Sequence, residues 1–492
     1  MTNDFRIDTD TMGEVRVPAN SHYGAQTQRA FDNFPISGLR FPRRFLRSLG
    51  LVKASAAIVN RELGLLTVEL AAAIETAANE VADGLWDDQF IVDVFQTGSG
   101  TSTNMNANEV IASRANEILG GRRGDMQPVR PNDEVNKGQS SNDVIPTVIH
   151  LAVLSSLDED LLPAMERLMQ GLQAKAHEFR DVLKTGRTHL QDAVPMMLGQ
   201  EFEAWASQIR HGIARIKAAR VNLLELPIGG TALGTGINTH PEFGQRMCDT
   251  LAATASVAIR RADSSFESMS CRDALVEASA ALRTVAVSLL KVAGDIRLLA
   301  SGPRTGIGEL HLPELQPGSS IMPGKVNPVI PEMMIQVCGQ VIGNDAAILV
   351  GGLMGQLDLN VMMPLMAHNL LQSISILAAG CRVMNDRCVS RGPEKPGHPA
   401  NAQGISANAD RCKALVESSL MPVTALVPHI GYKAAAAIAI EASQSGRTIR
   451  DIVAERQLFS PEQLDSLLNL TEMARSNRSK SPKTTKGMNE TA

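Results

Sequence analysis

Residues 282–299 read Leu-Arg-Thr-Val-Ala-Val-Ser-Leu-Leu-Lys-Val-Ala-Gly-Asp-Ile-Arg-Leu-Leu, and their apolar positions alternate between steps of three and four residues. The stripe consists of Leu282, Val285, Leu289, Val292, Ile296 and Leu299. This spacing places all six side chains on one face of an α-helix. A similar series begins at Leu151 and continues to Leu172. Long apolar stripes of this kind predict a bundle of long helices.

The composition agrees with helices and limits the classes of ligand. The chain has 492 residues, of which 44% are apolar and only 3% aromatic. Its length predicts two to four domains, and the scarcity of aromatic residues favours helix packing over strands. The net charge of −5 argues against nucleic acid as the main ligand, because there is no basic excess to neutralise phosphates. An anionic substrate would have to be bound by local cations and helix N-termini.

The six cysteines form no C-x-x-C pair and no Cys/His spacing that suits a metal. We therefore expect reduced, buried thiols, and neither a metal nor a cofactor. No apolar run reaches the length of a membrane span, and the polar N-terminus resembles neither a signal peptide nor a transit peptide. These features predict a cytoplasmic protein that does not bind a membrane.

Segments rich in Gly and Pro interrupt the helical pattern and suggest domain boundaries. Residues 1–45 are expected to be irregular with short turns, and further interruptions fall at 185–195, 227–240 and 301–328. The predicted organisation is an N-terminal mostly helical domain (1–139), a central long-helix bundle (140–390), a Pro/Gly-rich loop or insertion (391–404), a small C-terminal helical domain (405–473) and a disordered tail (474–492).

The segment with the most chemical potential is residues 318–329, Gly-Ser-Ser-Ile-Met-Pro-Gly-Lys-Val-Asn-Pro-Val. Its glycines allow backbone N–H groups and a serine to point into a cleft. Lys325 and Asn327 could bind and polarise one carboxylate. In such surroundings a serine hydroxyl could become acidic enough to act as a base.

A second candidate lies between two helical regions, in Thr185-Gly-Arg-Thr-His-Leu-Gln-Asp-Ala-Val-Pro. His189 can serve as an acid or base near neutral pH, with Thr188 as a carboxylate ligand and Glu332 as an orienting partner. Taken alone, this motif agrees at least as well with a purely structural role for His189 as with a catalytic one.

Two further tracts are rich in small hydrogen-bond donors. Residues 97–108 contain eight Ser, Thr or Asn residues and precede a predicted helix, and Ser140-Ser-Asn-Asp precedes another. Helix N-termini attract anions, but the same residues are ordinary helix caps, so both interpretations stay open. Arg130, in Val129-Arg-Pro-Asn-Asp-Glu, is a possible anion ligand on what is otherwise a simple turn.

Taken together, these motifs resemble class II fumarases of the fumarase/aspartase superfamily in their order and spacing. The resemblance extends from about residue 8 to about 470 and includes Gly229-Gly-Thr-Ala-Leu-Gly-Thr-Gly. It implies an all-α, three-domain, metal-free homotetramer in which four chains form a twenty-helix core and three chains build each active site. The expected substrate is a small dicarboxylate.

The resemblance also implies roles for individual residues. Ser319 matches the catalytic base, and His189 with Glu332 matches the group that positions a water. The implied substrate ligands are Ser99, Gly100, Thr101, Ser140, Ser141, Asn142, Thr188, Ser320, Lys325 and Asn327. Arg130, Asn132 and Asp133 match a possible accessory anion site, although many fumarases have His where Arg130 stands.

The implied reaction is the reversible hydration of fumarate to (S)-malate. His189 favours water over ammonia, because aspartases have Gln at this position. Residues 326–344 resemble aspartases as closely as fumarases, so aspartate ammonia-lyase, or a lyase on a related substituted fumarate or malate, is the alternative. A non-catalytic structural protein on the same scaffold is a third hypothesis, against which Ser319, His189, Lys325 and Asn327 argue.

Overall fold

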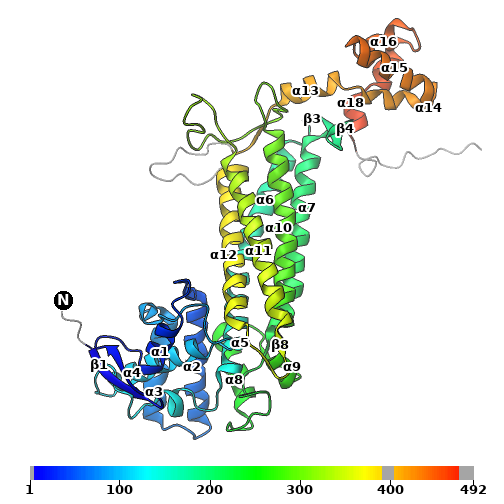
Figure 1. The fold of residues 1–492 in the computed structure, drawn as a ribbon. Helices are drawn as coiled ribbons and strands as arrows, with labels where there is room; N and C mark the ends of the chain where they lie inside the picture. Colours follow the sequence, from blue (N-terminus) through cyan, green and yellow to red (C-terminus); the bar gives the residue numbers. More distant parts are fainter. Residues whose placement is uncertain (1–4, 391–403, 476–492) are drawn as a thin grey trace, which may run out of the picture. The chain divides into compact units, whose positions relative to one another are not determined.

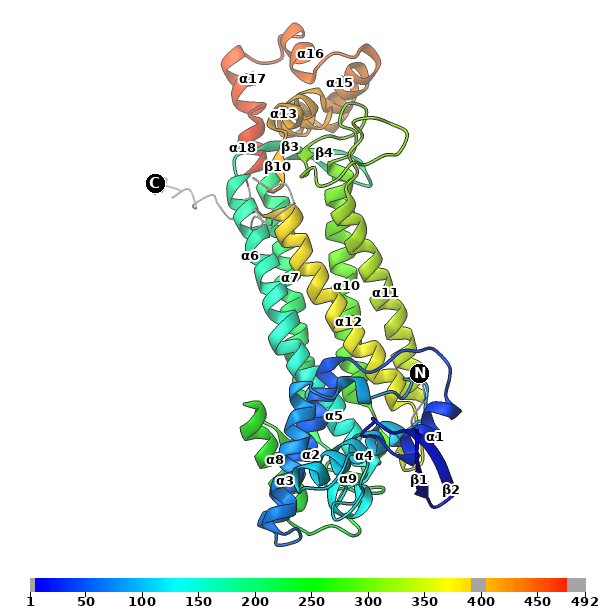
Figure 2. The ribbon, with the colours of Figure 1, turned by 90° about the vertical axis from the view of Figure 1, so that its left-hand side faces the viewer.

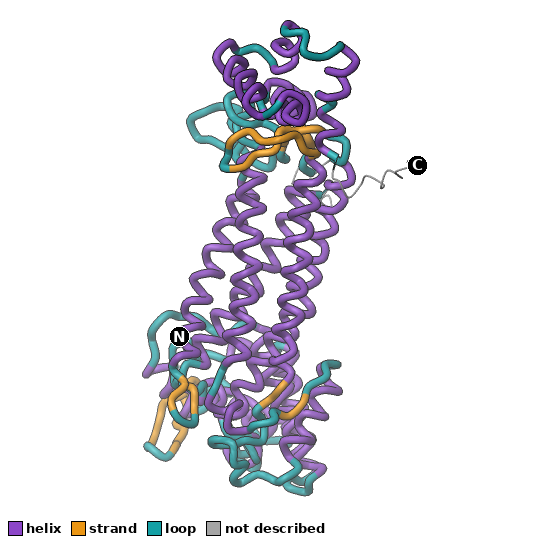
Figure 3. The backbone as a smooth tube through the Cα atoms, turned by 90° about the vertical axis from the view of Figure 1, so that its right-hand side faces the viewer, coloured by secondary structure: helices purple, strands orange, loops and turns teal. Residues whose placement is uncertain are grey.

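A computed structural model describes residues 5–390 and 404–475. Helices dominate these residues, and every sheet among them has only two strands (Figure 3). The prediction of an all-α helical-bundle fold is confirmed. The chain divides into two compact units. Unit 1 comprises Met1–Met165, His211–Ser288 and Gln336–Gly380, and unit 2 comprises Glu166–Arg210, Leu289–Ile335 and Cys381–Ala492.

The helices of the first half of the chain are α1 (Ala25–Asn33), α2 (Arg43–Glu62), α3 (Val68–Asp83), α4 (Thr101–Ile118), α5 (Ser141–Ser156), α6 (Leu162–Glu178), α7 (Leu198–Ala219) and α8 (Phe243–Ala255). Those of the second half are α9 (Ser265–Ser270), α10 (Asp273–Leu299), α11 (Val329–Leu353), α12 (Met363–Met384), α13 (Ala409–Ser418), α14 (Val427–Ile430), α15 (Tyr432–Ser445), α16 (Ile449–Glu455), α17 (Pro461–Leu467) and α18 (Leu470–Ala474). Short 3₁₀ or π segments are η1 (Asp87–Gln89), η2 (Pro131–Val135), η3 (Leu157–Leu161), η4 (Arg220–Leu224), η5 (Asn385–Val389) and η6 (Met421–Leu426). The long helices α6, α7, α10, α11 and α12 each contribute residues to both units.

The strands pair as β1 (Phe5–Asp10) with β2 (Gly13–Pro18), β3 (Leu183–Thr188) with β4 (Gln191–Met197), β5 (Glu225–Leu226) with β6 (Arg260–Arg261), β7 (Leu310–His311) with β10 (Ser406–Ala407), and β8 (Gly355–Gln356) with β9 (Leu359–Asn360). Only the β5–β6 pair is parallel. The first hairpin, together with α1, differs from the irregular segment expected at 1–45. Phe5 and Ile7 alternate with polar residues, which is the period of a strand.

The apolar stripe of residues 282–299 lies on α10, and all six of its members are buried. The series from Leu151 to Leu172 is likewise buried, on α5, η3 and α6. The sequence period therefore identified the packed faces of these helices correctly. The domain boundaries proposed from composition stay predictions, and the loop predicted at 391–404 lies almost wholly outside the described residues.

In unit 1, helix α2 packs closely against α3. A Cβ added at Gly50 of α2 would lie 2.5 Å from the backbone nitrogen of Ala82 on α3, so only glycine allows this approach.

Helices α10, α11 and α12 lie side by side (Figure 2), and buried polar contacts join them. Ser279 donates to Asp345 at 2.7 Å, and the Asn344 amide donates to Ser373 at 3.0 Å. These contacts fix the register of the three helices.

In unit 2, the β3–β4 hairpin joins α6 to α7 (Figure 1). The rings of Phe179, Phe202 and Trp205 pack against one another where these helices meet. The Trp205 indole N–H donates to Asp295 of α10 at 3.3 Å, which fastens α7 to α10. A separate small core lies in the C-terminal segment, around Leu426, Ile438, Ile452 and Val453.

Helix α11 is unusually apolar for a helix with so much exposed surface. By length and composition alone it could cross a membrane, yet only 33% of its most apolar window is buried within the chain. Leu349, Val350 and Leu353 are 48%, 51% and 73% exposed. Exposed apolar surface of this kind marks a site of association.

Candidate active site

Residues 318–327 of unit 2 form a loop that closes on itself. The Gly318 N–H donates to the Lys325 carbonyl at 3.0 Å, and the Asn327 side-chain amide donates to the Gly318 carbonyl. A Cβ at Gly318 would lie 2.3 Å from the Lys325 carbonyl oxygen, so this closure requires glycine. The predicted ligands Ser320 and Lys325 are exposed on the loop.

Ser319 occupies a position inside this loop that suits a base. Its Oγ accepts hydrogen bonds from the backbone N–H groups of Ile321 at 3.2 Å and Met322 at 2.9 Å. Hydrogen bonds donated to an oxygen favour its charged form. The loop can therefore stabilise a serine alkoxide, which is the chemistry expected from the sequence.

His189 and Leu190 form the two-residue turn between β3 and β4 in unit 2. Both have positive φ angles, 55° and 60°; such angles are uncommon outside Gly, although less rare for His189 than for Leu190, because His is enriched there with Asn and Asp. A two-residue turn that matches the twist of its strands requires this conformation. Thr188 and His189 are consequently presented at an exposed tip. Sequence reasoning treated 185–195 as an interruption between helices and did not anticipate the hairpin.

Glu332, the expected partner of His189, lies on the first turn of α11. Its carboxylate is 3.7 Å from Nε of Arg297. Within the described residues of one chain, Glu332 and His189 make no hydrogen bond or ion pair. Their predicted pairing is thus not formed inside a single chain.

In unit 1, the structure brings together two of the predicted donor tracts. The hydroxyls of Ser99 and Thr101 are 2.9 Å apart, and the Thr101 hydroxyl is 2.7 Å from that of Ser141. Gly100, in a left-handed conformation at φ 72°, allows the turn into α4. Because Thr101 begins α4 and Ser141 begins α5, two helix N-termini meet at this hydroxyl chain. Such a place favours an anion.

The remaining residues of the Ser140–Asp143 motif connect this site to a neighbouring loop. Ser140 and Asp143 form a reciprocal cap on α5. The buried Asp143 carboxylate also accepts from the N–H groups of Gly229 at 3.0 Å and Thr231 at 2.9 Å. The Asn142 amide donates to the carbonyl of Ala232 at 2.8 Å. The glycine-rich segment after 227 therefore supports the start of α5.

Lys53, which was not among the residues predicted from the sequence, is a buried cation next to the segment that leads into α5. Its Nζ donates to Asn136 at 3.1 Å and to Gln139 at 3.0 Å, which holds the chain leading to Ser140. Burial lowers the pKa of Lys53 to about 7, and burial raises the pKa of Asp143 to about 6. The only available signal was a single lysine among the small and apolar residues of α2.

The predicted accessory residues lie on η2 and just before it. Arg130 pairs with Asp133 at 3.0 Å and with Glu134 at 2.8 Å on its own turn. An anion would have to compete with both carboxylates for this guanidinium. Asn132 and Asp133 line the same open cavity of about 600 Å³ as Arg130.

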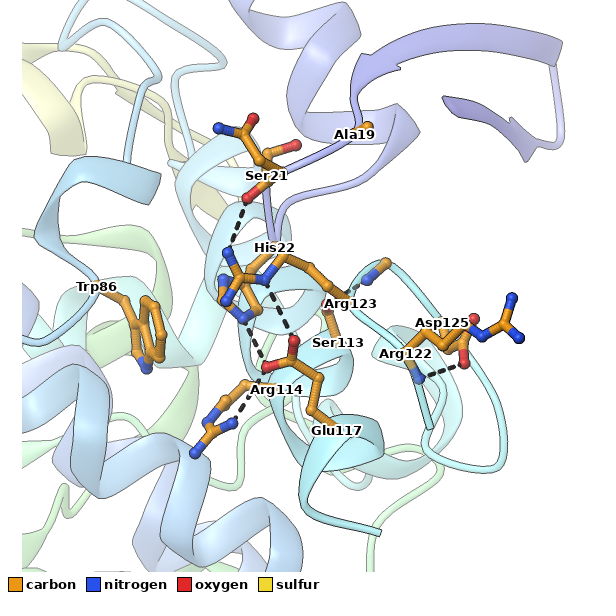
Figure 4. Close-up of polar contacts among 12 residues, drawn as sticks. Ala19, Ser21, His22, Trp86, Ser113, Arg114, Glu117, Arg122, Arg123 and Asp125 are labelled. Atoms are coloured by element: carbon orange, nitrogen blue, oxygen red, sulfur yellow. Dashed lines mark hydrogen bonds and ion pairs between the residues drawn. The ribbon is translucent and has the colours of Figure 1, made fainter. Parts of the chain in front are cut away.

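Another polar cluster, which sequence reasoning also missed, lies in unit 1 (Figure 4). The buried His22 ring is 3.0 Å from Glu117 and packs against Trp86 with ring centroids 4.3 Å apart. Arg114 and Arg123 donate to the same Glu117 carboxylate at 3.1 and 3.2 Å. Burial lowers the pKa of His22. These contacts tie the segment before α1 to α4, and they include none of the predicted site residues.

Known proteins match the chain over most of its length. The model of the lyase family matches residues 13–343, and that of the fumarase C C-terminus matches residues 423–475. A fumarate hydratase class II of Halobacterium salinarum is 52% identical, covering 95% of this chain and 97% of its own. The corresponding protein of Nitrosomonas europaea is 50% identical, covering 94% and 97%. The crystal structure of a class II fumarase from Schistosoma mansoni superposes with a TM-score of 0.91, at 37% identity, covering 96% and 99%.

The all-α fold, the closed serine loop and these matches define a lyase of the fumarase/aspartase superfamily. Within that superfamily, the chain belongs to the class II fumarase family.

Proposed function

We propose that this protein catalyses the reversible hydration of fumarate to (S)-malate by acid/base chemistry without a metal. The observation that carries the proposal is Ser319, whose Oγ accepts two backbone N–H groups inside a loop closed by Gly318. Identity of about half the residues to fumarate hydratases supports the choice of substrate.

Separate residues can remove the proton, stabilise the charge that develops and deliver the second proton. In the dehydration direction, the Ser319 alkoxide takes a proton from the methylene carbon of malate, and the electron pair moves into the carboxylate attached to that carbon. The Lys325 ammonium and the helix N-termini at Thr101 and Ser141 stabilise the developing charge. The C–O bond then breaks, the electron pair forms the C=C bond, and His189 protonates the departing hydroxide to give water.

We further propose that the protein works as a homotetramer in the cytoplasm, with a twenty-helix core and shared active sites. Two observations support association. Among the described residues of one chain, His189 makes no hydrogen bond or ion pair with Glu332, its expected partner. Helix α11 also exposes an apolar face at Leu349, Val350 and Leu353, which a second copy would cover.

For Arg130, Asn132 and Asp133 we propose at most weak anion binding and no catalytic role. The Arg130 guanidinium already has two carboxylate partners on its own turn. An anion has to displace at least one of them.

The activity is tested by following fumarate absorbance with and without ammonium, in the presence of a chelator. We expect fumarate loss without ammonium, with malate as the product. Ser319→Ala and His189→Gln should each reduce kcat by about 10²–10⁴-fold. His311→Gln, which alters another exposed histidine of unit 2, is the control and should leave kcat unchanged. Loss of fumarate only with ammonium would replace the proposal by the ammonia-lyase alternative.

Shared sites are tested by mixing the two inactive variants. If Ser319 and His189 of one site come from different copies, tetramers assembled from equal amounts of Ser319→Ala and His189→Gln chains regain about a quarter of wild-type activity. If each copy supplies both residues to the same site, mixing restores nothing.

A further inference from the structure

A buried cluster of charged side chains lies at the base of the hairpin that carries His189. Glu309 is 0% exposed and Lys184 is 1% exposed. One carboxylate oxygen of Glu309 is 3.3 Å from Lys184 Nζ, and the other is 2.9 Å from Arg187 Nη2. Lys184 also pairs with Glu201 of α7 at 3.1 Å. We call these four residues the Glu309 cluster.

The cluster depends on an irregularity in the hairpin. In a regular strand, residues three positions apart point to opposite faces. The register of β3 and β4 shifts between Thr185 and Arg187, and Gly186 lies so close to β4 that a Cβ would be 2.6 Å from the Val194 carbonyl. The interrupted pleat allows Lys184 and Arg187 to reach the same carboxylate. Such bulges redirect side chains near functional sites.

Glu309 is itself firmly held. Its N–H donates to the carbonyl of Leu299 at the end of α10 at 2.9 Å, and its carbonyl accepts from the Asn408 N–H at 2.9 Å. Two residues earlier, the carbonyl of Ile307 accepts a hydrogen bond from Arg411 Nε at 3.0 Å. Glu309 thus links the His189 hairpin to the segment between α10 and the Ser319 loop, entirely within unit 2.

The turn needs such support because its backbone is strained. His189 and Leu190 both have left-handed φ angles, and residues in this conformation persist only where their surroundings hold them. Arg187 precedes His189 by two positions, so its ion pair with Glu309 restrains the strand directly before the turn. The Arg187 side chain is only 15% exposed, which leaves it little freedom to exchange partners.

We propose that Glu309 is a positioning residue that acts through Arg187 to fix the His189 turn. It is a further determinant of turnover, although it contacts no substrate. The inference rests on the proposed function for the role of His189, but the geometric linkage does not depend on which small acid is the substrate.

The test compares three single variants and one double variant. Arg187→Met breaks the link to the turn but leaves Glu309 paired with Lys184, so the variant should fold. Glu309→Gln keeps the size of the side chain and removes its charge. Glu201→Gln is the control, because it removes a different partner of Lys184 and has no contact with Arg187. Each is purified as the assembled protein and checked for its melting temperature.

We expect Arg187→Met and Glu309→Gln each to lower kcat by about 10–100-fold, since a small misplacement of a catalytic group has an effect of this size. Glu201→Gln should stay within about twofold of wild type. The double variant Arg187→Met/Glu309→Gln should be no slower than the worse single variant, because both changes break one linkage. Effects that multiply in the double variant would show that Arg187 acts independently of Glu309 and would overturn the proposal, as would unchanged kcat in both folded single variants.

Hydrogen–deuterium exchange gives a readout that does not depend on activity. In Arg187→Met, amides of the hairpin 183–197 should exchange faster than in wild type, while those of α10 stay unchanged. Unchanged exchange in the hairpin would also refute the linkage. Wild-type turnover of fumarate separately tests the proposed function, so failure of one proposal is distinguishable from failure of the other.

Discussion

His150 allows a quantitative prediction of how stability depends on pH. It lies on α5 and is 7% exposed. Its Nδ1–H donates to the carbonyls of Leu223 at 3.1 Å and Glu225 at 2.9 Å. Burial lowers the pKa of His150 to about 4, and the positive charge of Arg272 acts in the same direction.

The sign follows from the protons bound in each state. An unfolded histidine has a pKa of about 6.5, so below this pH the unfolded chain binds a proton that folded His150 does not. The free energy of unfolding therefore falls as the pH falls. Relative to about pH 8, His150 alone should lower it by about 0.8 kcal/mol at about pH 6 and by about 2 kcal/mol at about pH 5.

Urea unfolding followed by circular dichroism tests this for wild type and His150→Gln. The protein concentration must be the same throughout, because association changes apparent stability. Between about pH 8 and about pH 5, wild type should lose about 2 kcal/mol more than His150→Gln. The exposed His211→Gln is the control and should follow wild type. Parallel curves for wild type and His150→Gln would refute the reasoning.

Three further changes have defined expectations. Gly98→Ala would place a Cβ 2.0 Å from the Val361 carbonyl oxygen. We therefore expect the free energy of unfolding, measured with urea, to fall by about 2 kcal/mol or more. The buried Glu109 carboxylate accepts hydrogen bonds from the N–H groups of Gly24, Gln26 and Thr27 at the start of α1. Glu109→Gln should therefore lower the free energy of unfolding by about 1–3 kcal/mol, whereas the exposed Glu69→Gln should not lower it. Arg130→Ala should leave kcat/KM for fumarate within about twofold, and a larger loss would restore an anion-binding role to this residue.

The long helices could be predicted because their information is local. The period of Leu282 to Leu299 appears in a single window and corresponds to one buried face. The hairpins were harder to predict. Gly and Pro in residues 1–45 indicated loops and obscured the alternation of Phe5 and Ile7, and the β3–β4 hairpin contains Gly186 and Pro195, both of which weaken a strand pattern.

Sequence motifs identified the candidate site residues, but they did not predict which groups contact those side chains. The glycines around Ser319 indicated a loop lined by N–H groups, but not that the donors to its Oγ are the N–H groups of Ile321 and Met322. Lys53 with Gln139, and Glu309 with Arg187, are contacts between residues far apart in sequence. A charged residue in an apolar helix signals burial but does not identify its partner.

The arrangement explains how a chain with a net charge of −5 can act on a dicarboxylate. We propose that the positive potential is local, because the expected carboxylate ligands are Lys325 and the N-termini of α4 and α5, which different copies of the chain can supply, and helix dipoles act over about one turn. Two arginines close in sequence to predicted site residues have carboxylate partners, as Arg187 pairs with Glu309 and Arg130 with Asp133 and Glu134. These two arginines hold local backbone in place, which leaves Lys325 as the lysine that we expect to bind the substrate. It follows that exchanging surface charges should change solubility more than turnover, whereas breaking the ion pair between Arg187 and Glu309 should lower turnover.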